Sequence, residues 1–159
     1  MSFETFEHKA DIGVRGKGKT LNIAFEECAK ALVSVMTQID SITPIKSHVL
    51  NLSANNEGAL LVLFLNELLF LKDKKKMLYS KYRVEINEEL GKETKEEAKA
   101  EIKNIKDDDK KISLKAVVFG EKIDSKKHEF KVDAKAATYS QLEVKKEGNI
   151  WVAQCIIDV

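Results

Sequence analysis

Apolar residues recur at three- and four-residue steps in two stretches of the chain. The first, from Leu21 to Val35, is apolar on one side and polar on the other, which predicts an amphipathic helix of about four turns. Thr20 precedes it and can cap its first turn with the side-chain hydroxyl. The second stretch, from Glu57 to about Lys72, is apolar almost all round, which is typical of a helix that is buried on two sides.

Elsewhere, apolar and polar residues alternate, and this pattern predicts strands. The expected strands lie near residues 3–6 and over residues 11–17, 49–53, 79–86, 112–118, 130–136, 142–144 and 150–159. Their short connections favour antiparallel pairing, and no helix-length segment follows Lys72 outside a charged stretch, so successive βαβ units are excluded. The expected fold class is α+β, with a mostly antiparallel sheet packed against two main helices.

The pattern breaks between Asn87 and Lys111, where Glu, Lys and Asp dominate. Such a composition cannot bury enough apolar surface to fold alone. We interpret residues 87–111 as a charged insertion in a hairpin, either a loop or a solvated helix. The whole chain, residues 1–159, is then a single domain.

Composition excludes several classes of function. The formal net charge is +1, so tight direct nucleic-acid binding is not expected, although a local basic patch stays open. Cys28 and Cys155 are too few for a zinc site and are predicted to be buried, reduced thiols. The longest apolar run, residues 59–65, falls short of the about 20 residues that span a membrane, and no secretory segment is expected, because the first residues contain no apolar stretch of the required kind. We therefore expect a cytoplasmic protein.

One candidate for chemistry is a phosphate-binding loop. Gly13, Gly18, Lys19 and Thr20 satisfy the pattern G-x-x-x-x-G-K-[ST]. That loop works when it joins a buried parallel strand to a helix, whereas the residues before Gly13 are mostly polar and the chain predicts no parallel core. The alternative interpretation of residues 16–20 is a tight turn followed by a helix cap.

A second candidate is a carboxylate site formed by Asp11, Asp158 and the α-carboxylate of Val159. Clusters of oxygen ligands suit hard cations such as Ca²⁺, Mg²⁺ and Mn²⁺, and three converging negative groups are strongly disfavoured without a cation. Spacing alone does not show that the two acids meet. The alternative, favoured by the residues alone, is that Asp11 is an acid in a turn and Asp158 belongs to a frayed end.

Several spaced motifs give the chain a resemblance to the archease family. They are HKADIG at residues 8–13, GKTL at 18–21, LNELLFL at 65–71, KAATY at 135–139 and IIDV at 156–159. The resemblance runs nearly end to end. Lys9 and Ser140 depart from it, because the family usually has a threonine and a histidine at these positions.

The resemblance implies an accessory protein without a reaction of its own. Archeases assist the RtcB-type RNA ligase of tRNA splicing, which uses GTP and divalent metal, by promoting its guanylylation and its multiple turnover. The family's metal site falls on Asp11, Asp158 and Val159, and Ca²⁺ is the ion most expected in a structure, with Mg²⁺ or Mn²⁺ as alternatives. The family's functional lysine falls on Lys135, and we add His8 as a candidate for contact with the partner or a phosphate.

Two other functions stay open at this point. The same resemblance implies a chaperone-like modulator of a tRNA methyltransferase as the first alternative. A nucleotide-binding protein built on residues 13–20 is the second. No membrane partner is expected.

Overall fold

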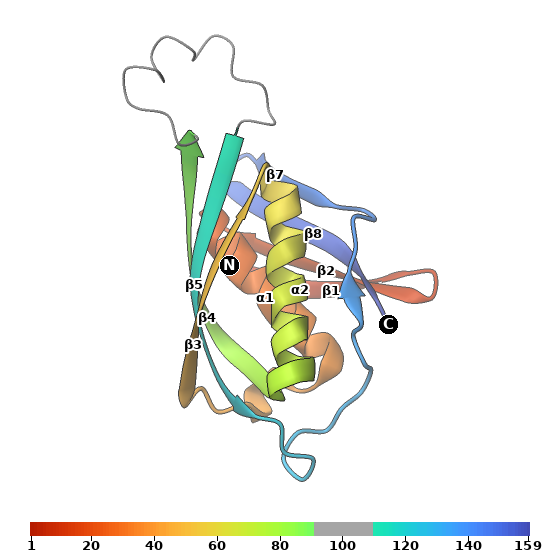
Figure 1. The fold of residues 1–159 in the computed structure, drawn as a ribbon. Coiled ribbons are helices and arrows are strands. Elements are labelled where there is room, and N and C mark those ends of the chain that lie inside the picture. The colour runs from red at the N-terminus through yellow and green to blue at the C-terminus, as the bar shows by residue number, and fades with distance from the viewer. Residues whose placement is uncertain (91–109) are drawn as a thin grey trace, which may run out of the picture.

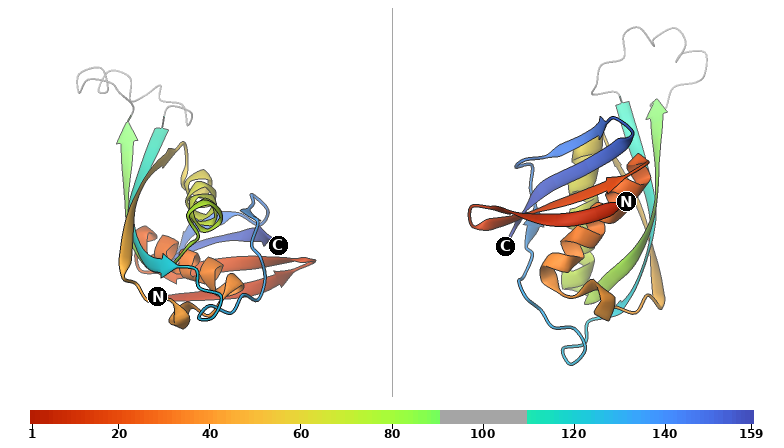
Figure 2. Two further views of the ribbon diagram at one scale, coloured as in Figure 1. Left: turned by 60° about the horizontal axis from the view of Figure 1, so that its bottom comes forward. Right: turned by 180° about the vertical axis from the view of Figure 1, so that it is seen from behind.

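The chain folds into two antiparallel sheets with two helices packed against both of them. A computed structural model describes residues 1–90 and 110–159. The first sheet has the strand order β1-β2-β8-β6, with β7 also paired to β8, and the second has the order β3-β5-β4. Figures 1 and 2 show the helices α1 and α2 on the inner sides of both sheets, so each sheet keeps one outer face.

The chain begins in the first sheet, forms the whole of the second sheet and then returns to complete the first. The first sheet contains β1 (Ser2–His8), β2 (Asp11–Gly18), β6 (Ala136–Ala137), β7 (Glu143–Glu147) and β8 (Ile150–Asp158). The second contains β3 (Lys46–Ala54), β4 (Met77–Leu90) and β5 (Lys110–Lys122). The helices are α1 (Leu21–Met36), the short 3₁₀ helix η1 (Ile39–Ser41) and α2 (Glu57–Lys75).

Helix α1 begins as its sequence predicts. The Thr20 hydroxyl accepts a hydrogen bond from the Ile23 N–H at 3.2 Å, which caps the first turn. Its apolar side is buried against the first sheet, and it approaches that sheet very closely at Gly16. A Cβ atom at Gly16 would collide with the backbone of Ala24 and Cys28, so only glycine permits this approach.

Helix α1 also closes the free edge of β4. The Val84 N–H donates to the Glu26 carboxylate at 2.8 Å, and the Ile86 N–H donates to the Asn22 side-chain oxygen at 3.0 Å. These side chains satisfy backbone donors that a further strand would otherwise satisfy. Burial raises the pKa of Glu26 above its ordinary value, although the Val84 hydrogen bond opposes this shift.

Helix α2 is buried on two sides, as its pattern predicts, and its cap is the Asn56 side chain, which accepts from the Ala59 N–H at 2.8 Å. Residues buried in the core include Leu61, Phe64 and Leu68. Leu63 and Phe70 stay exposed on a third side. No described helix is long and apolar enough to cross a membrane.

Two expectations need correction. The strands form two sheets instead of one, and residues 130–136 are not a strand except for Ala136, which pairs with β8. The alternation of burial in this segment arises from contacts with the helices. The Lys131 N–H donates to the Met36 carbonyl at 2.8 Å, so the backbone is tied to the end of α1 and not to a neighbouring strand.

The fold class agrees with expectation, and β4 and β5 pair as antiparallel neighbours that extend further than the predicted strands. β4 continues through Asn87 to Leu90, and β5 starts at Lys110, so the ends of the predicted insertion extend the two strands. Residues 91–109 lie outside the described residues. Cys28 and Cys155 are free and buried, and burial raises the pKa of the Cys155 thiol to about 12.

Candidate metal centre

The first predicted ligand stands at the start of β2, directly after a tight hairpin. His8 and Asp11 face each other across the two-residue connection Lys9–Ala10. Lys9 has a φ of 54°, in the left-handed region that side chains other than glycine adopt at a cost. The side chains of residues that face each other in an antiparallel pair lie on the same face of the sheet. His8 and Asp11 are therefore side by side.

The pairing of β2 with β8 brings the two ends of the chain together. Ile12 lies opposite Ile157, so the same register places Asp11 opposite Asp158. Opposite Cα atoms in such a pair are about 4.5–5.5 Å apart. Val14, three residues after Asp11, is fully buried against the helices, and residues three apart on a strand point to opposite faces, so Asp11 and Asp158 lie on the outer face.

The same row continues into β6. Ala136 lies opposite Asp158, and the Lys135 N–H donates to the Asp158 carbonyl at 2.8 Å. His8, Asp11, Asp158 and Ala136 thus form one row across the four strands β1, β2, β8 and β6. The Lys135 side chain is exposed, and Val159 follows Asp158 as the last residue.

One polar atom in the row lacks a hydrogen-bond partner. The Nδ1 of His8 is buried and has no hydrogen-bond partner among the described residues. A buried ring nitrogen without a partner is unfavourable, whereas a ligand or a cation beside it would use its lone pair. This is an observation of the structure that fits a bound ion near Asp11.

The donor set fits a hard cation, but its side chains do not by themselves make a complete site. Among the described residues, no group of three or more His, Cys, Asp and Glu side chains has the arrangement of a metal site. Asp11 and Asp158 supply two carboxylates, and the terminal carboxylate of Val159 follows Asp158 directly. Together these oxygens are the kind of ligand that Ca²⁺, Mg²⁺ and Mn²⁺ accept.

Two polar side chains of α2, which sequence reasoning did not select, hold the segment that carries Lys135. Asn66 donates to the Ala137 carbonyl at 3.1 Å and accepts from the Ala137 N–H at 2.8 Å. Lys72 is 5% exposed, and its amine contacts Asp133 at 2.9 Å and the Ala134 carbonyl at 3.0 Å. The available signal was a polar residue within an apolar helix, because such a residue needs a partner when buried.

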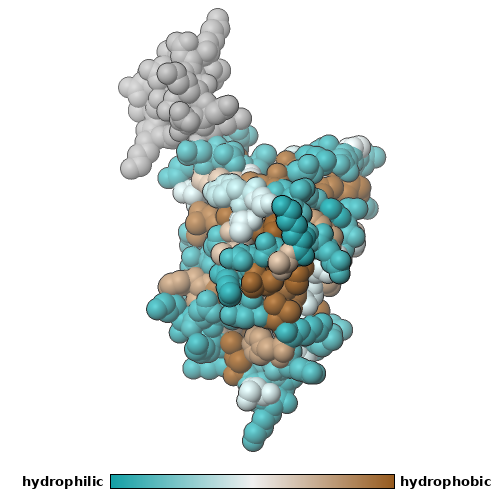
Figure 3. Space-filling model, turned by 90° about the vertical axis from the view of Figure 1, so that its right-hand side faces the viewer, coloured by the Kyte–Doolittle hydropathy of each residue, from teal (hydrophilic) through white to brown (hydrophobic). Residues whose placement is uncertain are grey.

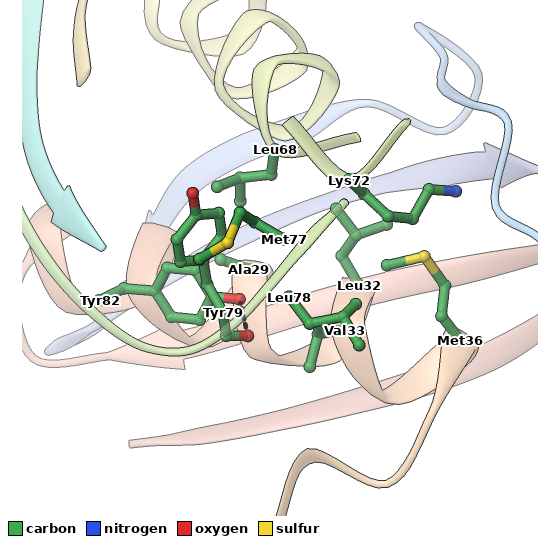
Figure 4. Close-up of a pocket in the computed structure, with 10 residues that line it drawn as sticks. All are labelled: Ala29, Leu32, Val33, Met36, Leu68, Lys72, Met77, Leu78, Tyr79 and Tyr82. Atoms are coloured by element: carbon green, nitrogen blue, oxygen red, sulfur yellow. Dashed lines mark hydrogen bonds between the residues drawn. The ribbon is translucent and has the colours of Figure 1, made fainter. Parts of the chain in front are cut away.

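An internal cavity next to Lys72 offers no second site. Its lining is almost entirely apolar and comes from α1, α2 and β4 (Figure 4). The volume that the centre of a water molecule can occupy in this cavity is only ≈ 10 Å³, which is close to the minimum for holding one water molecule. Figure 4 shows the Lys72 side chain running away from Tyr79 and Tyr82. The cavity is therefore a packing defect of the core.

The structure argues against the phosphate-loop interpretation. Residues 13–18 belong to strand β2, which pairs with antiparallel neighbours on both sides. An extended strand does not gather its N–H groups around a phosphate as a loop does. Thr20 caps α1 as the alternative proposed, while Gly16 and Gly18 are strand residues that contact the helix and not parts of a turn.

Comparisons with known proteins agree with one another. The chain matches the Archease protein family (MTH1598/TM1083) over residues 3–159. It is 35% identical over 160 residues to Protein archease of Thermococcus gammatolerans, covering 99% of this chain and 98% of the relative. It is 32% identical over 157 residues to Protein archease of Sulfurisphaera tokodaii, with the same coverage.

Solved structures share the fold over the whole chain. The solution structure of Methanobacterium thermoautotrophicum protein 1598 is 25% identical, covers 99% of both chains and superposes with a TM-score of 0.73. A crystal structure from Thermotoga maritima, described as an archease and possible chaperone, has a TM-score of 0.51 at 14% identity and supports the fold alone. It covers 98% of this chain and 96% of its own.

Proposed function

Because the chain belongs to the archease family, we propose that it is an accessory protein that activates an RtcB-type RNA ligase through a divalent cation held at the end of the first sheet. The observation that carries the proposal is the row His8–Asp11–Asp158, which the strand register builds from opposite ends of the chain beside the terminal carboxylate. The ion would lie on Asp11, Asp158 and Val159. Its role would be to offset negative charge at the ligase's nucleotide site.

The chain's own residues would perform the remaining tasks. Lys135 is exposed, and its backbone N–H bonds the Asp158 carbonyl, so its flexible ammonium group starts from the end of β8 and can contact a phosphate or an acid of the partner. Asn66 and Lys72 hold its segment against α2, so that the lysine starts from a fixed backbone position. His8 is placed to orient Asp11 or to contact the partner.

The face that carries these residues also offers apolar surface to a partner. Figure 3 looks at the side of the molecule where the C-terminus lies and shows apolar side chains gathered in its middle. The segment between β5 and β7 contains two exposed aromatic residues, Phe130, which is 42% exposed, and Tyr139, which is 67% exposed. Exposed aromatic residues of this kind favour a protein interface.

The test combines metal binding with ligase activity. Ca²⁺ should raise the melting temperature of the wild-type chain, because an ion that binds only the folded state stabilises it. Asp11→Ala and Asp158→Ala should abolish that rise and the stimulation of guanylylation of an RtcB-type ligase under multiple turnover. The double variant should be scarcely worse than either single one, since ligands of one ion act as a unit.

Controls separate this proposal from its alternatives. Asp40→Ala removes an exposed acid from η1 and should leave both measurements unchanged. An added C-terminal extension should reproduce the defect, because it displaces the Val159 carboxylate. Full stimulation by Asp158→Ala at limiting metal would contradict the proposal. Stimulation of a tRNA methyltransferase in place of the ligase would favour the chaperone-like alternative.

A further inference from the structure

The outer face of the second sheet carries three cations that form no ion pair with an acid among the described residues. We propose that this face binds single-stranded RNA, through a patch formed by Val49, Lys81, Arg83, Lys115, Val117 and Phe119. This patch is named the β3-β5-β4 patch below. Figures 1 and 2 show the sheet with its helices on one side and no other described segment over the opposite side.

The patch is built from three rows of residues that face each other across the strands. One row is Ser47, Phe119 and Lys81, the next is Val49, Val117 and Arg83, and the third is Asn51, Lys115 and Glu85. Residues two apart along a strand point to the same face and are about 6.6–6.8 Å apart. The three cations therefore form a spaced array on the outer face of the sheet.

The charges of the patch are available to a ligand. Lys81, Arg83 and Lys115 are exposed, and none of them is within ion-pair distance of an acid in the described part of the chain. Glu85 is the single acid in the three rows, opposite Lys115. An array of unpaired cations of this kind attracts the phosphates of a nucleic acid and releases the counterions around them.

The other side chains of the patch distinguish RNA from an acidic protein as the ligand. Val49 is 50% exposed, and Val117 and Phe119 are half-buried beside it, which leaves apolar surface between the cations. Lys81 lies over the Phe119 ring at 5.6 Å from its centre. Bases stack on aromatic rings and pack on apolar surface, whereas an acidic peptide needs only the charges.

Neutral polar groups continue the patch toward the far end of the sheet. A shallow open depression there is lined by residues that include Asn51, Ser53, Asn87 and Ser113. Their amides and hydroxyls can donate to and accept from the ribose 2′-hydroxyl, which is the group that distinguishes RNA from DNA. This is why we commit to RNA as the ligand.

The test measures fluorescence anisotropy of a short labelled oligouridylate with the isolated chain. Binding should weaken as salt rises from about 50 to 200 mM. Arg83→Gln/Lys115→Gln should weaken it further and lower the slope of log K against log salt by about 1.4, since each contact with a single strand contributes about 0.7. Lys81→Gln/Lys115→Gln should weaken RNA binding to the same extent. This variant keeps Arg83, whose charge lowers the pKa of Glu26 on α1.

A matched control comes from the first sheet. Lys17→Gln/Lys145→Gln removes the same number of charges from exposed side chains, which are 45% and 46% exposed, but these lysines already pair with acids. It should leave RNA binding unchanged. Phe119→Leu keeps apolar surface but removes the aromatic ring, and should weaken binding by about fivefold or more.

Several outcomes would overturn the proposal. They are no binding at the lower salt concentration, equal weakening by the first-sheet control, equal affinity for DNA of the same sequence, and equally strong competition by polyglutamate of matched charge. The last outcome would identify an acidic protein as the ligand of the patch. These measurements contain no ligase, so they are independent of the proposed function.

Discussion

The two sheets have the same construction, with helices on one face and solvent on the other, yet their outer faces differ in charge arrangement. On the first sheet Arg15 and Lys17 share Glu4, at 2.8 and 3.8 Å, and Lys145 lies between Glu143 and Glu147, at 3.1 and 2.9 Å. On the second, Lys81, Arg83 and Lys115 of the β3-β5-β4 patch form no ion pair with any acid of residues 1–90 and 110–159. A face whose charges are already paired gives a charged ligand little to gain, whereas a face with free charges attracts one.

The sheets also differ in how they meet α1. The first sheet meets the helix backbone directly through Gly16, and the second meets it through side chains, where Glu26 and Asn22 bond the edge of β4. A direct backbone contact has no room to adjust. A contact through a side chain can be replaced by another side chain of similar shape. Substitutions in the two sheets should therefore differ in severity.

The largest effect is expected for Gly16→Val, which breaks the close contact of the first sheet. The added atoms collide with the α1 backbone, and the loss of unfolding free energy should be about 3 kcal/mol or more. Urea denaturation followed by circular dichroism measures it. Lys17→Val is the control, because the next residue points outward and loses only an exposed ion pair worth about 1 kcal/mol or less. Equal losses in both variants would contradict this account of Gly16.

Glu26→Ala should have the next largest effect, on the second sheet. It leaves the Val84 N–H without its acceptor, which costs about 1–3 kcal/mol of unfolding free energy. Glu26→Gln keeps an oxygen acceptor and removes a charge whose burial raises its pKa, so it should be close to wild type. A glutamine variant as unstable as the alanine variant would show that the charge, and not the hydrogen bond, closes the edge.

Acid should lower the stability of the protein through Glu121, at the end of β5. Glu121 accepts hydrogen bonds from Lys127, from the Thr43 N–H and from His128, and these lower its pKa from 4.5 to about 2. A carboxylate with a lowered pKa adds stability above its ordinary pKa, and this stability is lost as pH falls from about 4.5 toward 2. Glu121→Gln should flatten the dependence of melting temperature on pH in this window. An unchanged slope would contradict the assignment.

The smallest effect is expected for Glu4→Gln, which makes the outer face of the first sheet more like that of the second. It frees Arg15 and Lys17 while costing about 1 kcal/mol of stability or less, since the ion pairs are exposed. RNA binding at low salt should rise, by about fivefold at most, which corresponds to the same energy. A fall in RNA binding would mean that pairing of charges does not distinguish the two faces.

The sequence predicts the local parts of this fold and not their assembly. The helix from Leu21 follows from a periodic apolar pattern and the cap at Thr20, which are properties of neighbouring residues. The division into two sheets depends on which strands pair across long stretches of chain, and no alternation pattern contains that information. Residues 130–136 show this clearly, because Val132 and Ala134 alternate in burial through contacts with the helices and not through a strand ladder.

The candidate site shows the same division. The residue types at Asp11, Asp158 and Val159 indicate hard-cation chemistry, but the sequence pattern does not show that they meet. The family resemblance groups them, and the register of β2 and β8 places Asp11 opposite Asp158. The roles of Asn66 and Lys72 could not be derived, because their partners lie 71 and 61 positions away in the chain. A polar residue in an apolar helix indicates that a partner exists but does not identify it.

Because side chains of α1 cover the edge of β4, another molecule can extend the second sheet less easily at β4 than at its other edge. A strand of a second molecule that approached β4 would have to displace Asn22 and Glu26 before it met the N–H groups of Val84 and Ile86. Intermolecular growth of a sheet, the first step toward fibrils, is thereby hindered on that side. In the described part of the second sheet, β3 pairs only with β5 and is the edge that stays open. Growth of the second sheet by addition of a strand from another molecule would therefore have to begin at β3.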